Sequence, residues 1–146
     1  MSLRVEEATD AAVDVEDAIR RLLPQLSETV PPLVTQDLEE IVASPSTRLL
    51  ILRDENDEIH GMLTLVLIGV PTGLRAHIED VVVDESARGQ GAGELLMRTA
   101  LELAEEAGAL SVDLTSSPAR EAANRLCLRV GFEARETNVY RAGKTA

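Results

Sequence analysis

A glycine-rich turn that joins a strand to a helix is the feature that most constrains this chain. Residues 77–83 (HIEDVVV) have the β-branched composition of a strand, and residues 92–107 repeat apolar side chains at helical spacing. Between them lies RGQGAG, residues 88–93, whose three glycines leave the backbone amides uncovered by side chains. The first N–H groups of a helix lack internal acceptors and lie at its positive dipole end. The segment therefore predicts a site for a phosphate or pyrophosphate.

The composition limits the class of protein and its partners. A length of 146 residues suits one core, and we expect a single domain over residues 1–146. There are 14 Lys and Arg against 26 Asp and Glu, a net charge of −12, which disfavours nucleic acid and anionic membranes as partners. The same charge favours a cationic substrate, although an acidic surface also serves solubility alone. Phe132 and Tyr140 are the only aromatic residues, so aliphatic side chains and backbone must form any substrate pocket.

The cysteine content and the N-terminus indicate a reducing compartment. The single cysteine, Cys127, excludes an internal disulfide and a cysteine-based zinc cluster, and we expect no metal. No segment has the pattern of a signal peptide or the length of a membrane span. We therefore expect a cytoplasmic protein.

The first half of the chain predicts two helices and an antiparallel meander. A short strand over residues 3–8 precedes a helix that Asp14 caps and that Pro24 should kink or end near Leu23. Thr35 is expected to cap a second short helix. Alternating or continuous apolar runs then predict three antiparallel strands, at residues 48–53, 59–70 and 74–83.

The second half alternates helices with strands. The helix over residues 92–107 should end at Gly108, and a strand over residues 110–115 should follow. Ser117 and Pro118 mark the start of another helix, which Gly131 stops. A last pair of strands is expected at residues 132–134 and 137–141. The fold class is therefore α+β, with a mixed, largely antiparallel sheet of about seven strands and about four helices.

Two familiar nucleotide motifs fit the glycine turn poorly. A P-loop needs a Lys followed by Ser or Thr after its last glycine, and Glu94-Leu95 stands there instead. The dinucleotide fingerprint gains support from Gly89, Gly91 and a later acid, Asp113. However, Glu94 occupies its third glycine position, and the preceding meander is not a βαβ unit.

A third interpretation comes from a family resemblance. The segment RGQGAG resembles the R/Q-x-x-G-x-G/A signature of the GNAT superfamily of acyl-CoA N-acyltransferases. Residues 123–132 (ANRLCLRVGF) are similar to that family's second signature, A-x-x-L-Y-x-x-x-G-F. The order of the expected elements also resembles the GNAT fold over most of the chain. That fold implies a sheet splayed between its fourth and fifth strands.

The resemblance implies where acetyl-CoA, the cosubstrate, would bind. The main chain of Val81 and Val83 would pair with the pantetheine arm, as an added strand would. Asn124 would reach this arm from the facing helix. The backbone amides of the glycine turn would hold the pyrophosphate; its residues are Arg88, Gly89, Gln90, Gly91, Ala92 and Gly93.

Acetyl transfer to an amine also requires a base that leaves the amine neutral. Strict alternation along residues 74–83 places Glu79 on one face with Val81 and Val83, and Asp80 on the more apolar, core-facing side. Glu79 is therefore the preferred base, acting through water, with His77 as helper or competitor. Asp80 stays an alternative, or it is a buried structural carboxylate.

The second signature contains a departure from the family pattern. Cys127 stands where GNAT enzymes commonly have the tyrosine that protonates the departing thiolate. A cysteine thiol can donate a proton but is shorter, and a small apolar role on the helix is the preferred interpretation. Tyr140 is the only tyrosine that could replace it.

These residues predict an acetyl-CoA-dependent N-acetyltransferase that acts directly on a primary amine of a small molecule or peptide. The alternative is a non-catalytic acetyl-CoA-binding regulatory module, suggested by the missing tyrosine. The segment HIEDVVVD is similar to that of glucosamine-6-phosphate N-acetyltransferases, but a cofactor strand does not define the acceptor. The family resemblance is also compatible with a homodimer.

Overall fold

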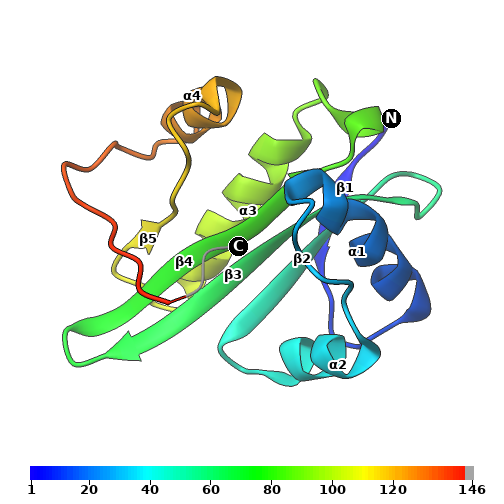
Figure 1. The fold of residues 1–146 in the computed structure, drawn as a ribbon, viewed down its shortest axis with the longest axis horizontal. Coiled ribbons are helices and arrows are strands. Elements are labelled where there is room, and N and C mark those ends of the chain that lie inside the picture. The colour runs from blue at the N-terminus through cyan, green and yellow to red at the C-terminus, as the bar shows by residue number, and fades with distance from the viewer. Residues whose placement is uncertain (144–146) are drawn as a thin grey trace. The chain divides into compact units, whose positions relative to one another are not determined.

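The computed structural model describes residues 1–143, which belong to two compact units. Unit 1 is Met1–Leu114, and unit 2 begins at Thr115. Unit 1 holds a five-stranded sheet, three α-helices and one 3₁₀ helix, η1 (Figure 1). Its elements are, in order, β1 (Arg4–Glu7), α1 (Val13–Leu26), α2 (Thr35–Ala43), β2 (Thr47–Arg53), β3 (Ile59–Val70), β4 (Gly73–Val83), η1 (Glu85–Ala87), α3 (Ala92–Glu106) and β5 (Val112–Asp113). Unit 2 holds α4 (Glu121–Arg129).

The sheet has the strand order β1-β2-β3-β4-β5. The first four strands pair antiparallel with their neighbours, whereas β5 runs parallel to β4. A parallel pair needs a crossover connection, and α3 supplies it. The mixed α+β fold and the meander of β2, β3 and β4 are therefore confirmed.

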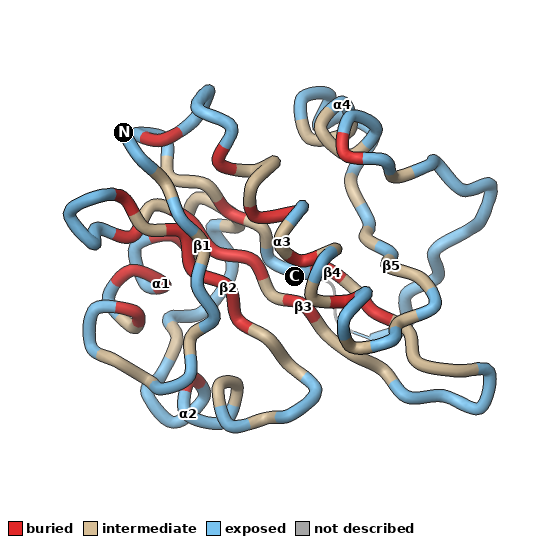
Figure 2. Tube along the Cα trace, turned by 180° about the vertical axis from the view of Figure 1, so that it is seen from behind, coloured by how far each residue is buried: buried red, intermediate tan, exposed pale blue. Residues whose placement is uncertain are grey.

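Helices cover both faces of this sheet (Figure 1). On one face, α1 packs on β3 and β4, and its buried side chains join Leu49, Met62 and Val82 in a single apolar cluster. On the other face, α3 packs on the same two strands through small and apolar side chains that include Leu96 and Ala100. Figure 2 shows buried positions along the central strands. Complete burial of a leucine such as Leu22 stabilises the fold by about 1.5–3 kcal/mol.

Helix α1 differs from its sequence prediction at both ends. It begins at Val13 with Ala12 as N-cap, and no side chain caps it, so the predicted cap by Asp14 is wrong. It also continues past Pro24 to Leu26. A proline in the last turn removes only one hydrogen bond, and the apolar face of the helix is already anchored by Ile19 and Leu22.

The predicted count of seven strands is wrong, because five are found. The strand expected over residues 110–115 is reduced to Val112–Asp113. The pair expected at residues 132–134 and 137–141 is absent from the described part of unit 2. Every residue from 133 to 143 is exposed, including Val139 and Tyr140, so this segment has no apolar face for a strand to bury. Within residues 1–143, no helix combines the length and apolar character that a membrane crossing requires.

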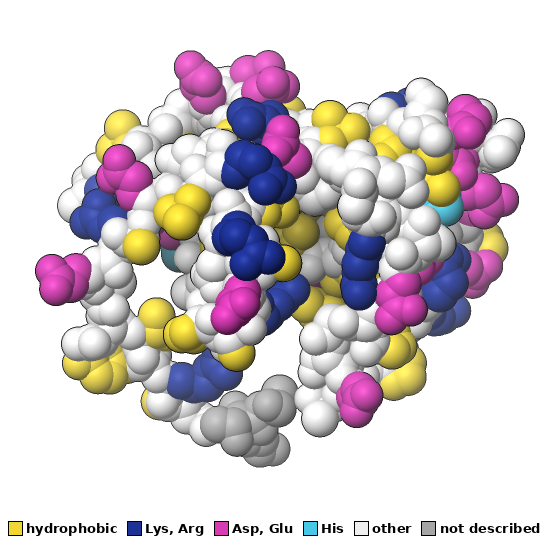
Figure 3. Space-filling model, turned by 90° about the horizontal axis from the view of Figure 1, so that it is seen from above, with side chains coloured by type: hydrophobic (Ala, Val, Ile, Leu, Met, Phe, Trp, Pro, Cys, Tyr) yellow, Lys and Arg dark blue, Asp and Glu magenta, His cyan; other side chains and the backbone are white. Residues whose placement is uncertain are grey.

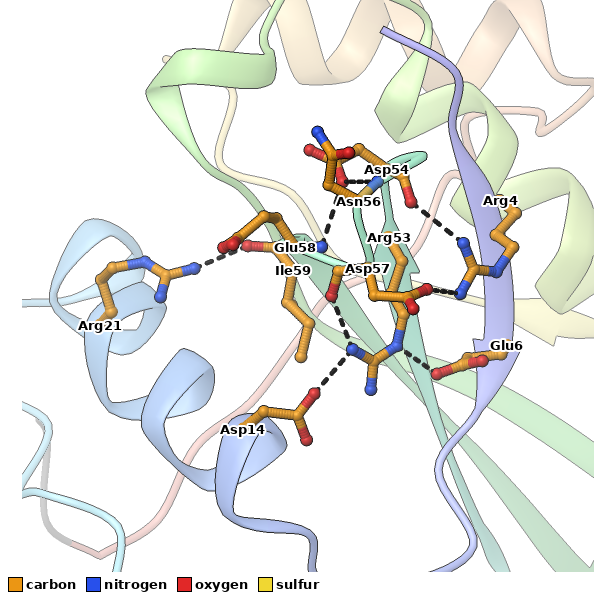
Figure 4. A network of polar contacts seen from close by, with 10 residues as sticks. All are labelled: Arg4, Glu6, Asp14, Arg21, Arg53, Asp54, Asn56, Asp57, Glu58 and Ile59. Carbon is orange, nitrogen blue, oxygen red and sulfur yellow. Dashed lines mark hydrogen bonds and ion pairs between the residues drawn. The ribbon is translucent and has the colours of Figure 1, made fainter.

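A polar network ties the β2–β3 turn to β1 and α1 (Figure 4). Arg53 forms ion pairs with Glu6 and, at 2.7 Å, with Asp14. Its guanidinium lowers the pKa of the Asp14 carboxyl below the ordinary value. Arg4 pairs with Asp57 and donates to the carbonyl oxygen of Asp54. These contacts fix the edge strand β1 against the turn.

Asp54, in the same turn, makes the folded state sensitive to acid. Its buried carboxylate lies 2.7 Å from Nε2 of His60 and accepts from the backbone amides of Asn56 and Glu58. The His60 hydrogen bond, followed by these amides, lowers the pKa of Asp54 below its ordinary value. A lowered folded-state pKa contributes stability that is present above the unfolded value, about 4 for aspartate, and is lost as the pH falls through the folded value.

We therefore expect Asp54→Asn to reduce the free energy of unfolding at pH 7, with a difference from wild type that shrinks as the pH falls below about 4. Urea denaturation between pH 7 and pH 2.5 measures this difference. Asp10→Asn, at an exposed position, is the matched control. A difference that stays constant over the whole range would contradict the assignment.

Candidate functional site

β4 carries a bulge at Asp80. Between the pairs Glu79–Thr64 and Val82–Met62, β4 has two residues where β3 has one. Asp80 has a φ of 51°, in the left-handed region that residues other than glycine rarely occupy. A bulge of this kind bends the strand and redirects the side chains that follow it.

The pairing of β4 with β3 places Glu79 on the sheet face that carries α1. Thr64, opposite Glu79, is also opposite Leu49, which belongs to the α1 cluster. Val82 belongs to the same cluster, so Glu79 and Val82 share a face although they are three residues apart. His77 precedes Glu79 by two regularly paired residues and shares this face as well.

The alternation predicted for this strand is therefore wrong beyond Glu79. One extra residue reverses the phase of a strand, so Val81 and Val83 lie on the face opposite to Glu79. The expectation that Asp80 is buried is also wrong, because both Asp80 and Glu79 are exposed. A carboxylate on a bulge can remain in water, and it needs no internal donors.

The edge of β4 that faces β5 is paired over a short stretch only. β5 pairs with Ala76 and His77, and the amide of Ala76 donates to the carbonyl oxygen of Ser111 at 2.9 Å. Within the described residues, no strand pairs with this edge over residues 78–83. Unpaired backbone groups on a strand edge can bind an extended ligand, as an added strand would.

The glycine turn leads directly from this edge into α3. Asp84 caps η1, and its side chain accepts from the amide of Ser86 at 3.4 Å. Gly89 and Gly91 have φ values of 79° and 76°, which strongly favour glycine. Gly91 is the N-cap of α3, and its carbonyl oxygen accepts from the Leu95 amide at 3.0 Å.

The residues of the turn fit a phosphate group. Within residues 1–143, the backbone N–H groups from Gly89 to Gly93 make no hydrogen bond of good geometry to a protein acceptor. Gly89, Gln90 and Gly91 are exposed, Gly93 is half-buried and Ala92 is buried, so the first three residues of this group are open to a ligand. Free amides at the start of a helix of 15 residues, beside an unpaired strand edge, suit a ligand that joins an extended arm to a pyrophosphate.

Comparison with known protein families identifies the family of this chain. The family model described as the acetyltransferase (GNAT) family matches residues 15–132. The chain belongs to the GNAT family. Members of this family use acetyl-CoA as the acetyl donor, which agrees with the turn as a pyrophosphate site.

Individual proteins resemble this GNAT chain in sequence or in fold. The "Probable glucosamine 6-phosphate N-acetyltransferase 2" of Oryza sativa subsp. japonica is 48% identical over 46 residues, which cover 32% of this chain and 28% of that protein. The structure of glucosamine-6-phosphate N-acetyltransferase from Arabidopsis thaliana has a TM-score of 0.81 at 19% identity, covering 99% of this chain and all of that one. A structure described as a transcriptional regulator from Bacillus halodurans C-125 has a TM-score of 0.79 at 27% identity, covering 97% and 99% of the two chains.

The side chain of Arg88, at the start of the glycine turn, is directed back toward β4. Its Nε donates to the carbonyl oxygen of Val83 at 3.3 Å. Gln90 similarly donates to the carbonyl oxygen of Ser86 at 3.5 Å. These bonds brace the turn internally, and the Arg88 guanidinium stays exposed next to the last residue of the strand.

Unit 2 carries the second group of predicted residues. Asn124 of α4 donates through its side-chain amide to the carbonyl oxygens of Arg120, at 2.8 Å, and Ser117, at 3.0 Å. Its NH₂ group therefore secures the start of its own helix, which begins at Glu121 rather than next to Pro118. Only its carbonyl oxygen stays available for the predicted contact with a cofactor arm.

The two proton donors predicted in unit 2 differ in their environments. Burial raises the pKa of the Cys127 thiol above its ordinary value, so the thiol is protonated at neutral pH. Tyr140 is 88% exposed, and its hydroxyl accepts from Asn138 at 3.3 Å. Cys127 is thus the more shielded donor of the two.

Two polar features of the structure could not be identified from sequence patterns. One is the pair of Asp54 and His60 described above. The other is Ser116, whose hydroxyl is buried without a hydrogen-bond partner among the described residues. A serine next to a helix start has many ordinary roles, so no pattern in the sequence distinguishes Ser116.

A cavity of about 350 Å³ adjoins the glycine turn in unit 1. Gln90 and Gly91 line it together with Met1, Leu3 and three residues of α3. None of the predicted catalytic side chains lines it.

Within residues 1–143, no cluster of three His, Cys, Asp or Glu side chains is placed to hold a metal ion. The face in Figure 3 carries basic as well as acidic side chains, so the net charge of −12 does not make every part of the surface acidic.

Proposed function

We propose that this chain is an acetyl-CoA-dependent N-acetyltransferase that transfers the acetyl group directly to a primary amine of a small molecule or peptide. The observation that carries the proposal is the set of free amides from Gly89 to Gly93, which follows the unpaired edge of β4. The family match over residues 15–132 supports acetyl-CoA as the donor.

Acetyl-CoA supplies a thioester whose acetyl group can be attacked by an amine. The backbone amides of Gly89 to Gly93 would hold its pyrophosphate, and the edge groups of Val81 and Val83 would align its extended arm. Because backbone groups would bind the pyrophosphate and the extended arm, this binding depends on the backbone conformation rather than on particular side chains. This arrangement would orient the acetyl donor, and other residues would bind the acceptor amine.

Glu79 is the proposed general base. It is exposed on the α1 face of β4, where it can accept a proton from the amine directly or through water. His77 lies on the same face and would serve as helper. Asp80 is exposed at the bulge and stays the alternative base.

Cys127 is the proposed donor of the proton that the departing thiolate requires, and Tyr140 is the alternative. The raised pKa of Cys127 supports a role as acid rather than as a nucleophilic thiolate. We expect Cys127→Ala to lower kcat by a factor on the order of 10², with little change in the affinity for acetyl-CoA. Steady-state kinetics and calorimetric titration measure the two quantities.

Two further variants test this assignment of the acid. Cys127→Ser replaces the thiol by a hydroxyl, which can also donate a proton, and should recover part of the rate, whereas Tyr140→Phe should not alter it. An unchanged kcat in Cys127→Ala would remove Cys127 from the mechanism. A lowered kcat in Tyr140→Phe would then identify Tyr140 as the proton donor.

A non-catalytic acetyl-CoA-binding module is the second candidate. Two observations favour it: Cys127 occupies the position of the usual tyrosine, and one structural relative is described as a transcriptional regulator. Purified protein is incubated with acetyl-CoA and a panel of amines, and thiol release is followed. The panel contains polyamines, amino sugars including glucosamine 6-phosphate, amino acids, aminoglycosides and peptides with free N-termini.

Amine-dependent thiol release would support the enzyme and identify its acceptor. Binding of acetyl-CoA without release on any amine of the panel would favour the regulatory module. A protein that does not bind acetyl-CoA at all would contradict both functions.

A further inference from the structure

The glycine turn is attached to α1 at the point where it leaves β4. Gln25, in the last turn of α1, donates from Nε2 to the Asp84 carboxylate at 3.5 Å. Its Oε1 accepts from the backbone amide of Glu85 at 3.3 Å. One half-buried side chain thus contacts both residues that begin the segment between β4 and the glycines.

Arg21, one helical turn before Gln25, reinforces this attachment. Its Nε lies 3.7 Å from the second oxygen of Asp84, and its Nη2 donates to the carbonyl oxygen of Ile59 at 2.6 Å. The amide of Asp84 in turn donates to the carbonyl oxygen of His60 at 2.7 Å. Asp84 is therefore held from α1 on one side and from β3 on the other.

Helix α1 can serve as a fixed support because it is packed on the end of the same strand. Its buried side chains Ile19 and Leu22 lie in one cluster with Met62 and Val82, the latter two residues before Asp84. A shift of α1 would disturb this core, so the positions of Arg21 and Gln25 are set by packing. Groups held in this way can fix a loop with little further loss of entropy.

We propose that Gln25, assisted by Arg21, is a positioning residue for the phosphate-binding turn. The proposal rests on the proposed function, because it assumes that the amides of Gly89 to Gly93 bind the pyrophosphate of acetyl-CoA. Gln25 does not contact these glycines. It acts through Asp84 and Glu85, which set the direction in which the chain enters the turn.

The test compares Gln25→Met with wild type. Methionine keeps the length of the side chain and removes both hydrogen bonds, so a change in binding reports on the bonds rather than on packing. Calorimetric titration with CoA should show a dissociation constant about three- to tenfold higher, which corresponds to one net hydrogen bond. KM for acetyl-CoA should rise by a similar factor, with kcat at saturating acetyl-CoA nearly constant.

Hydrogen exchange gives a readout that does not depend on activity. The Glu85 amide donates to Gln25, so its exchange should be faster in Gln25→Met while the amides of β3 keep their rates. Asp84→Asn is the second variant, because it removes the negative charge that pairs with Arg21. In the double variant with Gln25→Met, the loss of CoA affinity should be smaller than the sum of the losses in the two single variants, because Gln25 and Asp84 share a contact.

Gln36→Met is the matched control. Gln36 is exposed on α2 and bonds to Glu40 within its own helix, so it should leave CoA affinity unchanged. If wild type binds CoA and folded Gln25→Met binds it equally well, the positioning role is refuted and the proposed function stands. If wild type binds no CoA, both the proposed function and the positioning role are refuted.

Discussion

Replacing Glu79 by glutamine is expected to lower kcat for amine acetylation by about 10²- to 10³-fold at pH 7. Most primary amines are protonated at this pH, and only the neutral form can attack a thioester. Glutamine preserves the shape of the side chain and cannot accept a proton. The affinity for acetyl-CoA should stay near that of wild type, because the proposed contacts with acetyl-CoA come from backbone groups of other residues and not from the Glu79 side chain.

The pH dependence of this variant gives a sharper test than its rate at one pH. As the pH rises toward the pKa of the amine, the neutral fraction increases about tenfold per unit without help from a base. The difference in kcat/KM between wild type and Glu79→Gln should therefore decrease between pH 7 and pH 9.5. A difference that does not change with pH would indicate that Glu79 positions the acceptor rather than deprotonates it.

Asp80→Asn is the matched control for Glu79→Gln. Asparagine also tolerates the left-handed conformation that Asp80 adopts, so this change should leave the bulge intact. We expect an activity within about threefold of wild type if Glu79 is the base. If Asp80→Asn shows the large loss and Glu79→Gln does not, the two assignments must be exchanged.

The sequence was sufficient for the part of the site that depends on backbone conformation. Glycine is favoured at positive φ, so the residue types at Gly89 and Gly91 are enough to predict a turn with free amides. The helix that follows is marked by apolar periodicity and by Gly108, which has a φ of 86°. Local signals of this kind do not depend on distant parts of the chain.

The bulge in β4 could not be predicted in the same way. A bulge depends on the pairing of two strands, and the residue in the left-handed conformation is an aspartate rather than a glycine. Strict alternation therefore predicted the wrong face for Val81 and Val83 relative to Glu79. The preference for Glu79 over Asp80 remains a prediction.

The prediction of strands over residues 132–134 and 137–141 was wrong for a related reason. Residues 132–141 contain β-branched and aromatic residues, but a strand is stable only when a neighbouring edge and a buried face accept it. Leu128, Val139 and Tyr140 are exposed in unit 2. Propensity alone therefore overestimated the sheet.

Substituting valine for Gly91 is expected to raise the dissociation constant for CoA by about 10²-fold. The backbone at Gly91 has φ 76° and ψ 13°, and a β-branched residue is strongly disfavoured there. A Cβ atom would meet nothing within 4 Å, so the cost arises from the backbone conformation and not from a clash. Relief of this strain would turn the neighbouring amides away from the pyrophosphate, and each lost bond to a charged group costs about 1.5–3 kcal/mol.

Two variants separate backbone conformation from side-chain size in this test. Gly91→Asn places a larger polar side chain at the same position, yet asparagine tolerates the left-handed region, so CoA binding should stay within about fivefold of wild type. Gly69→Val adds the same side chain as Gly91→Val at an exposed strand position, where a Cβ atom also meets nothing within 4 Å, and should not affect binding. Calorimetric titration with CoA and thermal unfolding of each variant measure binding and folding separately. If folded Gly91→Val binds CoA as tightly as wild type, the amides of the turn do not hold the pyrophosphate, and the ligand must be bound elsewhere on the chain.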